Sequence, residues 1–343
     1  MAEENVKTEF IEQGVLEGHS NWVTSILTGF PQNDSDESDV LVSASRDKTI
    51  MIWKLFNEEK DGLYGLPHKS MTGHNHFITD LSLSNDNNHL ISSSWDKTAR
   101  LWDLKNTKTV NRFEGHNGEV FSCAFSNDNR QILTVGSDNL IKLWNTKGEC
   151  KYTNEFKNHK DWVSVVKYAP KIKTQTKATY QPYFATAGWD GRLKIWNTNI
   201  QIRYSFKAHD GQINDLSISP NGMLIATGGR DQKAKIWELG NFEAPVREFN
   251  TPSPINKLAF NPKMQWVAAA TDTGVCIWDV TKEDDNVLSH LVLEAEKPKE
   301  SKKEKLPKYL PAHSVAWSPN GKKLFAGFGN GKIKVWHTSI EKH

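Results

Sequence analysis

Short apolar runs rich in Val, Ile, Leu and Ala recur along the whole chain, and polar clusters of Gly, Asp, Asn and Ser separate them. Residues 41–55, LVSASRDKTIMIWKL, show the pattern once: an apolar run, a charged turn and a second apolar run that contains a tryptophan. Runs of this length between turn residues are typical of β-strands. The pattern therefore predicts an all-β protein with many short strands.

The strand–turn–strand unit occurs seven times. Each copy contains a tryptophan, and six residues before it stands an aspartate, or Asn330 in the last copy. The tryptophans are 41 or 42 residues apart where insertions are absent. This period is typical of a WD-repeat β-propeller with four strands per blade. We predict a single seven-bladed propeller domain over residues 1–343, with blade-ending tryptophans Trp53, Trp102, Trp144, Trp196, Trp237, Trp278 and Trp336.

Five blades carry a histidine in the loop before their first strand, and the same five carry a hydroxyl four residues before the turn aspartate. In the other two blades this position is Ala268 or Ala326. A buried hydroxyl without a partner costs about 1–3 kcal/mol, which explains the coupling if aspartate, histidine, hydroxyl and indole form a buried hydrogen-bond relay. We interpret these groups as structural tetrads and not as hydrolytic sites: His19, Ser43, Asp47 and Trp53; His74, Ser92, Asp96 and Trp102; His116, Thr134, Asp138 and Trp144; His159, Thr186, Asp190 and Trp196; His209, Thr227, Asp231 and Trp237.

The chain begins with a strand-like segment, TEFIEQGVLE at residues 8–17, and ends just after the third strand of the seventh repeat. Similar segments precede the histidine loops of later blades. We therefore expect the N-terminal strand to complete the last blade, because ring closure leaves only short exposed edges.

Composition narrows the possible functions. A formal net charge of +2 argues against a polycation that coats nucleic acid without selectivity. The chain has no signal-peptide pattern and no apolar run of about 18 residues, so we expect a cytoplasmic protein without membrane insertion. Cys123, Cys150 and Cys276 fit neither a disulfide framework nor a zinc site, and we expect them to be reduced residues of the core or strands. We predict a non-enzymatic protein with no metal, cofactor or small-molecule substrate.

Three insertions interrupt the repeat. Residues 31–39 are acidic, residues 170–182 are basic, and residues 282–310 combine seven lysines with seven acidic residues. The last insertion is predicted to be a mobile surface loop.

Large side chains recur at two positions near one mouth of the predicted propeller, three residues after the blade histidine and just before the turn aspartate. These positions vary between blades, and they carry the residue types that are enriched at binding hot spots. A protein-binding mouth is one interpretation and packing over neighbouring loops is the other. The candidate residues are Trp22, Phe77, Trp95, Trp162, Trp189 and Arg230.

Basic residues cluster in sequence around the turns of the first two blades. Arg46 and Lys48 lie in SRDKT, Lys97 lies in the sister turn SWDKT, and Lys69 lies just ahead of the second blade. On adjacent blades these residues would form a patch suited to phosphates, and the alternative is an ordinary solvated rim.

Five stretches resemble the receptor for activated C kinase family of WD-repeat proteins: SASRDKTIMIWKL, SWDKTARLWDL, DNRQILTVGSDNLIKLWNTKGECKYT, HKDWVSVVKYAP and LFAGFGNGKIKVW. The resemblance implies a scaffold bound to the small (40S) ribosomal subunit that contacts ribosomal RNA and ribosomal proteins. It also implies recruitment of signalling proteins, including protein kinase C, to regulate translation in the cytoplasm. The family's basic turn of blade one is a ribosome contact, which implies this role for Arg46 and Lys48, and we extend the footprint to Lys69 and Lys97.

Blade six, SPINKLAFNPKMQWV, resembles the family less closely than the other blades, so its capacity to bind a kinase stays open. The alternative function is a WD-repeat adaptor of G-protein β or ubiquitin-ligase type that acts away from the ribosome.

Overall fold

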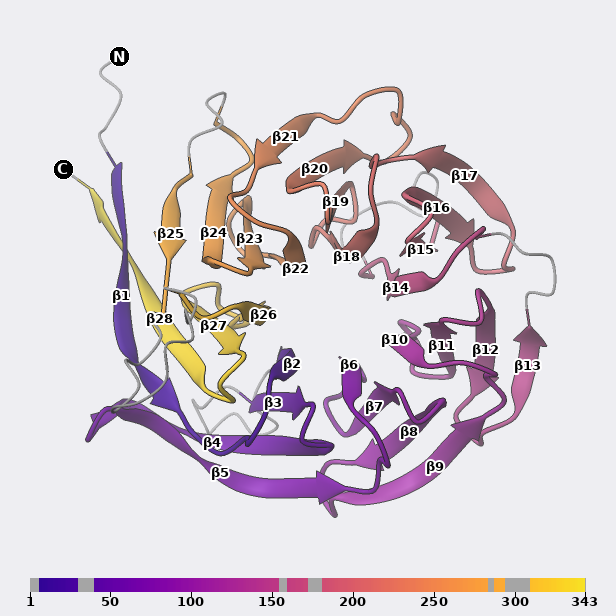
Figure 1. The fold of residues 1–343 in the computed structure, drawn as a ribbon, viewed down its shortest axis with the longest axis horizontal. Helices are drawn as coiled ribbons and strands as arrows, with labels where there is room; N and C mark the ends of the chain where they lie inside the picture. The colour runs from indigo at the N-terminus through magenta and orange to yellow at the C-terminus, as the bar shows by residue number, and fades with distance from the viewer. Residues whose placement is uncertain are drawn as a thin grey trace, which may run out of the picture.

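The computed structural model describes residues 6–29, 40–153, 159–171, 181–282, 287–293 and 309–342. Within these ranges the regular elements are 28 β-strands, arranged as seven blades around a central axis (Figure 1). The all-β, seven-bladed architecture is confirmed. The insertion at 31–39 lies outside the described residues, as do most of the insertions at 170–182 and 282–310.

Each blade is a four-stranded antiparallel sheet that begins at the axis and ends at the perimeter (Figure 1). Blades one to three consist of β2 (Val23–Gly29), β3 (Val40–Ser45), β4 (Thr49–Lys60) and β5 (Leu63–Thr72); β6 (Ile78–Leu83), β7 (His89–Ser94), β8 (Thr98–Asp103) and β9 (Lys108–Glu114); and β10 (Val120–Phe125), β11 (Gln131–Gly136), β12 (Ile141–Asn145) and β13 (Cys150–Thr153).

Blades four to six follow the same order. They consist of β14 (Val163–Tyr168), β15 (Tyr183–Gly188), β16 (Arg192–Asn197) and β17 (Ile202–Lys207); β18 (Ile213–Ile218), β19 (Leu224–Gly229), β20 (Lys233–Glu238) and β21 (Arg247–Asn250); and β22 (Ile255–Phe260), β23 (Trp266–Thr271), β24 (Gly274–Asp279) and β25 (Ser289–Leu291).

The two ends of the chain form the seventh blade together. Strands β26 (Ala312–Trp317), β27 (Lys323–Phe328) and β28 (Ile333–Lys342) are completed by β1 (Val6–Leu16), which pairs antiparallel with β28. The predicted closure by the N-terminal strand is therefore confirmed. A register shift between Glu12 and Gly14 marks a bulge in β1, and Gly14 has a φ of 131° that suits glycine. A single parallel bridge from Val15 to Leu63 of β5 joins the sheets of blades seven and one.

Side chains on the innermost strands tie each blade to the next. Thr24 donates a hydrogen bond of 2.7 Å to the carbonyl of Ile78 in blade two, and Thr79 donates one of 2.7 Å to Val120 in blade three. These bonds satisfy the first carbonyl of each receiving strand, which would otherwise be unpaired near the axis. The other inter-blade bonds of this kind run from Ser164 to Ile213, Asn214 to Ile255, Asn256 to Ala312 and Ser314 to Val23.

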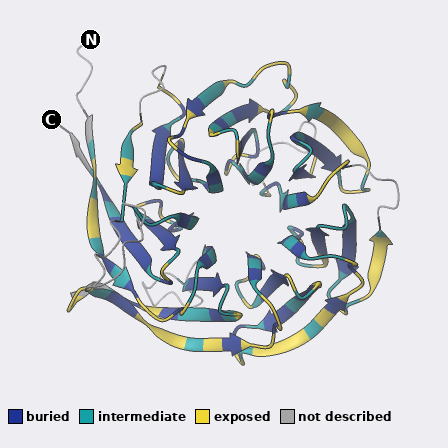
Figure 2. Ribbon diagram, viewed as in Figure 1, coloured by how far each residue is buried: buried dark blue, intermediate teal, exposed yellow. Residues whose placement is uncertain are grey.

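The core lies between the blades. Trp196 of blade four packs with Leu133 and Val135 of blade three, and comparable clusters join the other neighbouring blades. The second strand of each blade is almost entirely buried, the innermost strands alternate between buried and partly exposed residues, and the outer strands are exposed along much of their length (Figure 2). Trp266 and Trp317, two tryptophans outside the blade-ending set, are both buried. Of the cysteines, Cys123 and Cys276 are buried and Cys150 is exposed on β13; all three are free.

Candidate functional site

The five tetrads form as hydrogen-bonded relays on one face of the propeller, which we call the histidine face. In blade one His19 Nδ1 lies 2.8 Å from Asp47 Oδ2 and His19 Nε2 lies 2.7 Å from Ser43 Oγ, and Trp53 Nε1 donates to the same hydroxyl at 2.8 Å. The same contacts recur at 2.7 to 3.0 Å in blades two to five. Each hydroxyl is held between an imidazole and an indole, so the relays stabilise the fold.

Hydrogen bonds to the tetrad aspartates keep their carboxyl groups ionised. Burial alone would raise the pKa of Asp47, but hydrogen bonds from His19 and Thr49 lower it to about 2. The carboxylate therefore remains charged throughout the physiological pH range.

Blade six lacks the tetrad hydroxyl, and its strand register corrects which alanine stands at that position. Counting ten residues back from Trp278 gives Ala268, but the β23–β24 turn is shorter than the others, and the registers place Ala269 opposite Cys276 where Thr134 lies opposite Lys142 in blade three. Ala269 shares a buried cluster with Trp278, whereas Ala268 belongs to a different one. Among the residues that the structure describes, the buried indole Nε1 of Trp278 has no hydrogen-bond partner. Alanine stands at either position, so the coupling between histidine and hydroxyl holds.

Predicted mouth residues and one predicted ribosome contact meet in a continuous row of rings on the histidine face. The Arg46 guanidinium carbon lies 3.6 Å from the centre of the Trp22 ring and 5.2 Å from that of Phe77. The centres of the Phe77 and Trp95 rings are 5.5 Å apart. We call the group His313, Trp22, Arg46, Phe77 and Trp95 the first aromatic arc. It spans blades seven, one and two and encloses a pocket of about 160 Å³.

His313 of the first aromatic arc was not singled out from the sequence. Its ring stacks on Trp22 with the two centres 4.1 Å apart and an angle of 12° between the planes. Its Nε2 is buried and has no hydrogen-bond partner in the described part of the chain. Burial, with a further contribution from Arg46, lowers the pKa of His313 to about 4, so the imidazole is neutral at physiological pH. His313 is the second residue of an innermost strand. The other six blades have a hydroxyl, amide or Phe side chain at this position, so the histidine stands out when the repeats are compared, and this difference could have identified it from the sequence.

A second group with two tryptophans, a phenylalanine and an arginine, but no histidine, lies on blades three to five. The ring centres of Trp162 and Trp189 are 4.3 Å apart, Phe121 lies 5.5 Å from Trp162, and the Arg230 guanidinium lies 5.8 Å from the Trp189 ring. We call Phe121, Trp162, Trp189 and Arg230 the second aromatic arc. The structure thus divides the predicted mouth into two sets. Trp95 and Trp162 are the most exposed tryptophans, each with 37% of its surface accessible.

Lys48 and Lys97 occupy equivalent turns of neighbouring blades beside the first aromatic arc. Both are exposed, and both have a left-handed backbone, with φ of 71° and 70°. Arg46 differs from them because its half-buried side chain is directed into the row of rings. Burial lowers the pKa of Arg46, although the guanidinium remains charged.

Lys69 does not join this patch. It lies on β5, the outer strand of blade one, and its ammonium donates a hydrogen bond of 3.0 Å to the carbonyl of Lys105 in the β8–β9 turn. That turn is at the opposite end of the strands from Lys97. Lys69 comes shortly before blade two in the sequence, which suggested a location on the histidine face. The extended strand β5 instead carries Lys69 away from that face.

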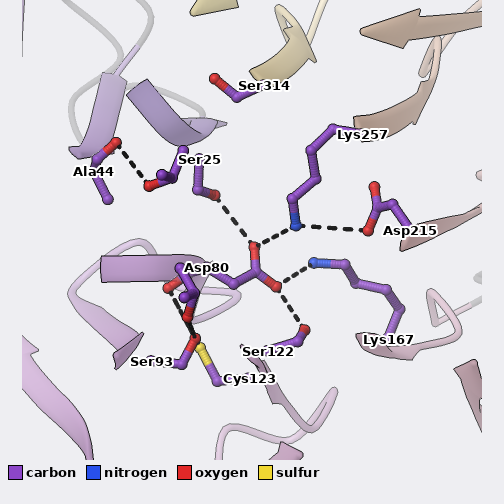
Figure 3. Close-up of polar contacts among 12 residues, drawn as sticks. Ser25, Ala44, Asp80, Ser93, Ser122, Cys123, Lys167, Asp215, Lys257 and Ser314 are labelled. Atoms are coloured by element: carbon purple, nitrogen blue, oxygen red, sulfur yellow. Dashed lines mark hydrogen bonds and ion pairs between the residues drawn. The ribbon is translucent and has the colours of Figure 1, made fainter. Parts of the chain in front are cut away.

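Sequence reasoning also missed a charged network in the central channel (Figure 3). The third residues of the innermost strands occupy equivalent positions beside the channel, and five of the seven take part in one network of contacts there: Ser25, Asp80, Ser122, Asp215 and Lys257. Lys167, the fifth residue of β14, joins them. Asp80 of blade two lies 3.3 Å from Lys257 of blade six and 3.0 Å from Lys167 of blade four, and it accepts hydrogen bonds from Ser25 and Ser122. Lys257 also approaches Asp215 of blade five at 3.6 Å.

The charges of the channel network depend on one another. Burial would raise the pKa of Asp80, but Lys167 and Lys257 hold it well below its usual range. Burial does raise the pKa of Asp215, because Lys257 compensates it less completely and its Oδ1 accepts no hydrogen bond from the described residues. The network lines a cavity of about 600 Å³ and connects blades that are distant in sequence.

Two absences apply to the residues that the structure describes. They contain no group of three or more side chains suited to hold a metal ion. None of their elements is a helix long and apolar enough to cross a membrane.

Comparison with known proteins agrees with this architecture. The family model described as WD domain, G-beta repeat, matches the chain seven times, at residues 11–54, 65–103, 107–145, 148–197, 200–238, 243–279 and 305–337. Blades, tetrads and matches together define a seven-repeat WD-repeat β-propeller.

Two relatives match almost from end to end. The protein named small ribosomal subunit protein RACK1 of Drosophila melanogaster is 41% identical over 332 residues, which are 96% of this chain and 98% of that protein. Cross-pathway control WD-repeat protein 2 of Flammulina velutipes is 40% identical over 324 residues, 94% of this chain and 96% of that protein. The chain therefore belongs to the RACK1 family of WD-repeat proteins, the receptors for activated C kinase that its motifs resemble.

Proposed function

We propose that this protein is a non-enzymatic scaffold bound to the small ribosomal subunit in the cytoplasm, where it contacts ribosomal RNA and ribosomal proteins. The observation that carries the proposal is the 41% identity, along 96% of the chain, to a protein named as a component of that subunit. The proposed role requires no cofactor, no small-molecule substrate and no insertion into a membrane.

The proposed ribosome contact is the pair of equivalent turns on blades one and two. Lys48 and Lys97 are exposed there beside Arg46, so three cations face the same side of neighbouring blades. Clustered Lys and Arg side chains attract RNA phosphates, and each contact lowers the affinity as salt is added. Lys69 is left out of this contact, because the outer strand β5 carries it away from the histidine face.

The proposed docking site for recruited proteins, including protein kinase C, is the second aromatic arc. Its Trp162 is exposed, and Trp189 and Arg230 are adjacent. Trp and Arg dominate binding energy at protein interfaces. This arc is separate from the lysine turns, so the scaffold would hold the ribosome and a partner at the same time.

The test is sedimentation of cell extract through a sucrose gradient at moderate and high salt. A Lys48→Glu, Lys97→Glu double variant is expected to remain at the top of the gradient, while the natural protein migrates with small subunits. Lys160→Glu, on the histidine face of blade four, is the matched control and should migrate like the natural protein. Absence of the natural protein from the subunit fractions at both salt concentrations would reject the proposed function.

A further inference from the structure

We infer that the first aromatic arc is a stacking pocket for one unpaired pyrimidine of single-stranded RNA in the small ribosomal subunit. The inference rests on the proposed function and extends it from phosphate contacts to recognition of a base. Three features support it: the chemistry of the pocket walls, the polar groups left without partners, and the size of the pocket.

The walls of the pocket are planar rings with a cation among them. Trp22, Phe77, Trp95 and His313 line the space, and Arg46 lies over the first two rings. Bases stack on aromatic side chains and on guanidinium planes, and such stacking is largely independent of sequence. A cage for a methylated ammonium group uses similar rings, but Arg46 would repel a cation.

Two polar groups at this pocket have no hydrogen-bonding or ionic partner among the described residues. Among the described residues the Arg46 guanidinium forms no ion pair and no side-chain hydrogen bond, although burial already withdraws it partly from water. His313 Nε2 is buried and equally without a partner. A nucleotide supplies both complements, because its phosphate pairs with a guanidinium and the edge of its base carries hydrogen-bonding groups.

The backbone around the pocket favours a nucleotide over an extended peptide. Peptides added to a sheet are held by main-chain hydrogen bonds. Here the carbonyls of Trp22 and Phe77 already accept hydrogen bonds from Arg46 and Trp95, and the Trp22 and Phe77 amides donate to Asn21 and His76. The carbonyl of Ile78, also at the pocket, accepts from Thr24. No main-chain edge remains at these residues for a peptide to pair with.

The size of the pocket indicates which base it takes. A cavity of about 150 Å³ accommodates benzene, and this one measures about 160 Å³. One six-membered ring therefore fills this space, whereas a bicyclic purine would project from the open side of the pocket. The exposed Lys48 and Lys97 lie on the flanking turns, where they would meet the phosphates on either side of the bound nucleotide.

The experiment measures binding of a ten-nucleotide oligouridylate and an oligoadenylate of equal length to the purified full chain. Quenching of tryptophan fluorescence is the readout. Oligouridylate is expected to bind more tightly, and Trp95→Leu is expected to weaken it about five-fold or more, because one stacked base is lost. Tyr152→Leu, which removes an exposed aromatic side chain on the outer strand β13 outside both arcs, is the matched control and should leave the affinity unchanged.

Arg46→Gln serves as the second variant if Trp95→Leu lowers the melting temperature. It should weaken oligouridylate binding and reduce its dependence on salt. Equal effects of Trp95→Leu and Tyr152→Leu, tighter binding of oligoadenylate, or binding of an acidic peptide but of neither oligonucleotide would each overturn the inference. Sedimentation of the natural protein with ribosomes decides the proposed function separately, so the two failures are distinguishable.

Discussion

At individual positions, the availability of a hydrogen-bond partner determines which side chain a blade tolerates. Blades one to five surround their hydroxyl with an imidazole and an indole, and these contacts satisfy all three groups. Blade six has neither histidine nor hydroxyl at its tetrad positions, and the buried Trp278 indole nitrogen has no partner within the described ranges. An unpaired buried donor costs about 1–3 kcal/mol. Blade six is therefore less stabilised by its tetrad positions than its neighbours.

Ala269→Ser is expected to be better tolerated than Ala268→Ser by about 1–3 kcal/mol in the free energy of unfolding. The serine at 269 would present its hydroxyl to the Trp278 indole, because both residues share one buried cluster. The serine at 268 would enter the other, apolar cluster without an acceptor for its proton. Urea denaturation of the two variants measures the difference. Equal midpoints would show that the hydroxyl at 269 does not reach the indole.

At the scale of single elements, strand β1 closes the ring of blades. It pairs with β28 from Val6 to Leu16, and the bulge near Gly14 allows the strand to curve before it enters the first histidine loop. Phe10 on this strand packs against two blades: its ring centre lies 6.0 Å from that of Trp266 in blade six and 6.3 Å from that of Trp317 in blade seven. The strand thus joins the last blade by backbone pairing and by side-chain packing.

Phe10→Ala should lower the free energy of unfolding by about 1–3 kcal/mol, less than for a fully buried phenylalanine because Phe10 is half-buried. Ile11→Ala is the matched control on the same strand. Its side chain is 48% exposed, so its removal should change stability by no more than about 0.5 kcal/mol. Thermal melting followed by tryptophan fluorescence compares the two variants. A larger loss for Ile11→Ala would contradict the packing role of Phe10.

At the scale of the whole molecule, the central channel links blades through charge. Asp80 brings together Lys167 of blade four and Lys257 of blade six, and Lys257 extends to Asp215 of blade five. Four blades therefore depend on one buried carboxylate, in addition to the hydrogen bonds between neighbouring blades. A buried charge network of this kind holds the ring closed only while every member keeps its partner.

Asp80→Asn is expected to lower the free energy of unfolding by about 3–5 kcal/mol, since it leaves two ammonium groups without their shared carboxylate. The sign of the pH effect follows from the lowered pKa of Asp80. Its stabilisation is present above about pH 3.9, the usual value for an aspartate, and is lost as pH falls through the folded-state pKa. Urea midpoints should therefore decrease more steeply for the natural protein than for Asp80→Asn as the medium becomes acidic. Parallel profiles would contradict this account.

The sequence alone determined the all-β class, the seven repeats, the closing strand and the tetrads. These features leave local marks, because alternation, turn residues and a paired loss of histidine and hydroxyl are visible along the chain. It also singled out the lysines of the turns and the residues of the two arcs, with the exception of His313 and Phe121.

Only the tertiary structure decided which of those residues meet. Blade curvature placed Arg46 against Trp22 and Phe77, brought His313 from the far end of the chain to Trp22, and carried Lys69 away from the histidine face. The channel network had no local mark either, because Asp80 and Lys257 lie 177 residues apart in the chain. Contacts around a closed ring depend on the rotation between blades, and no local pattern of residues encodes that rotation.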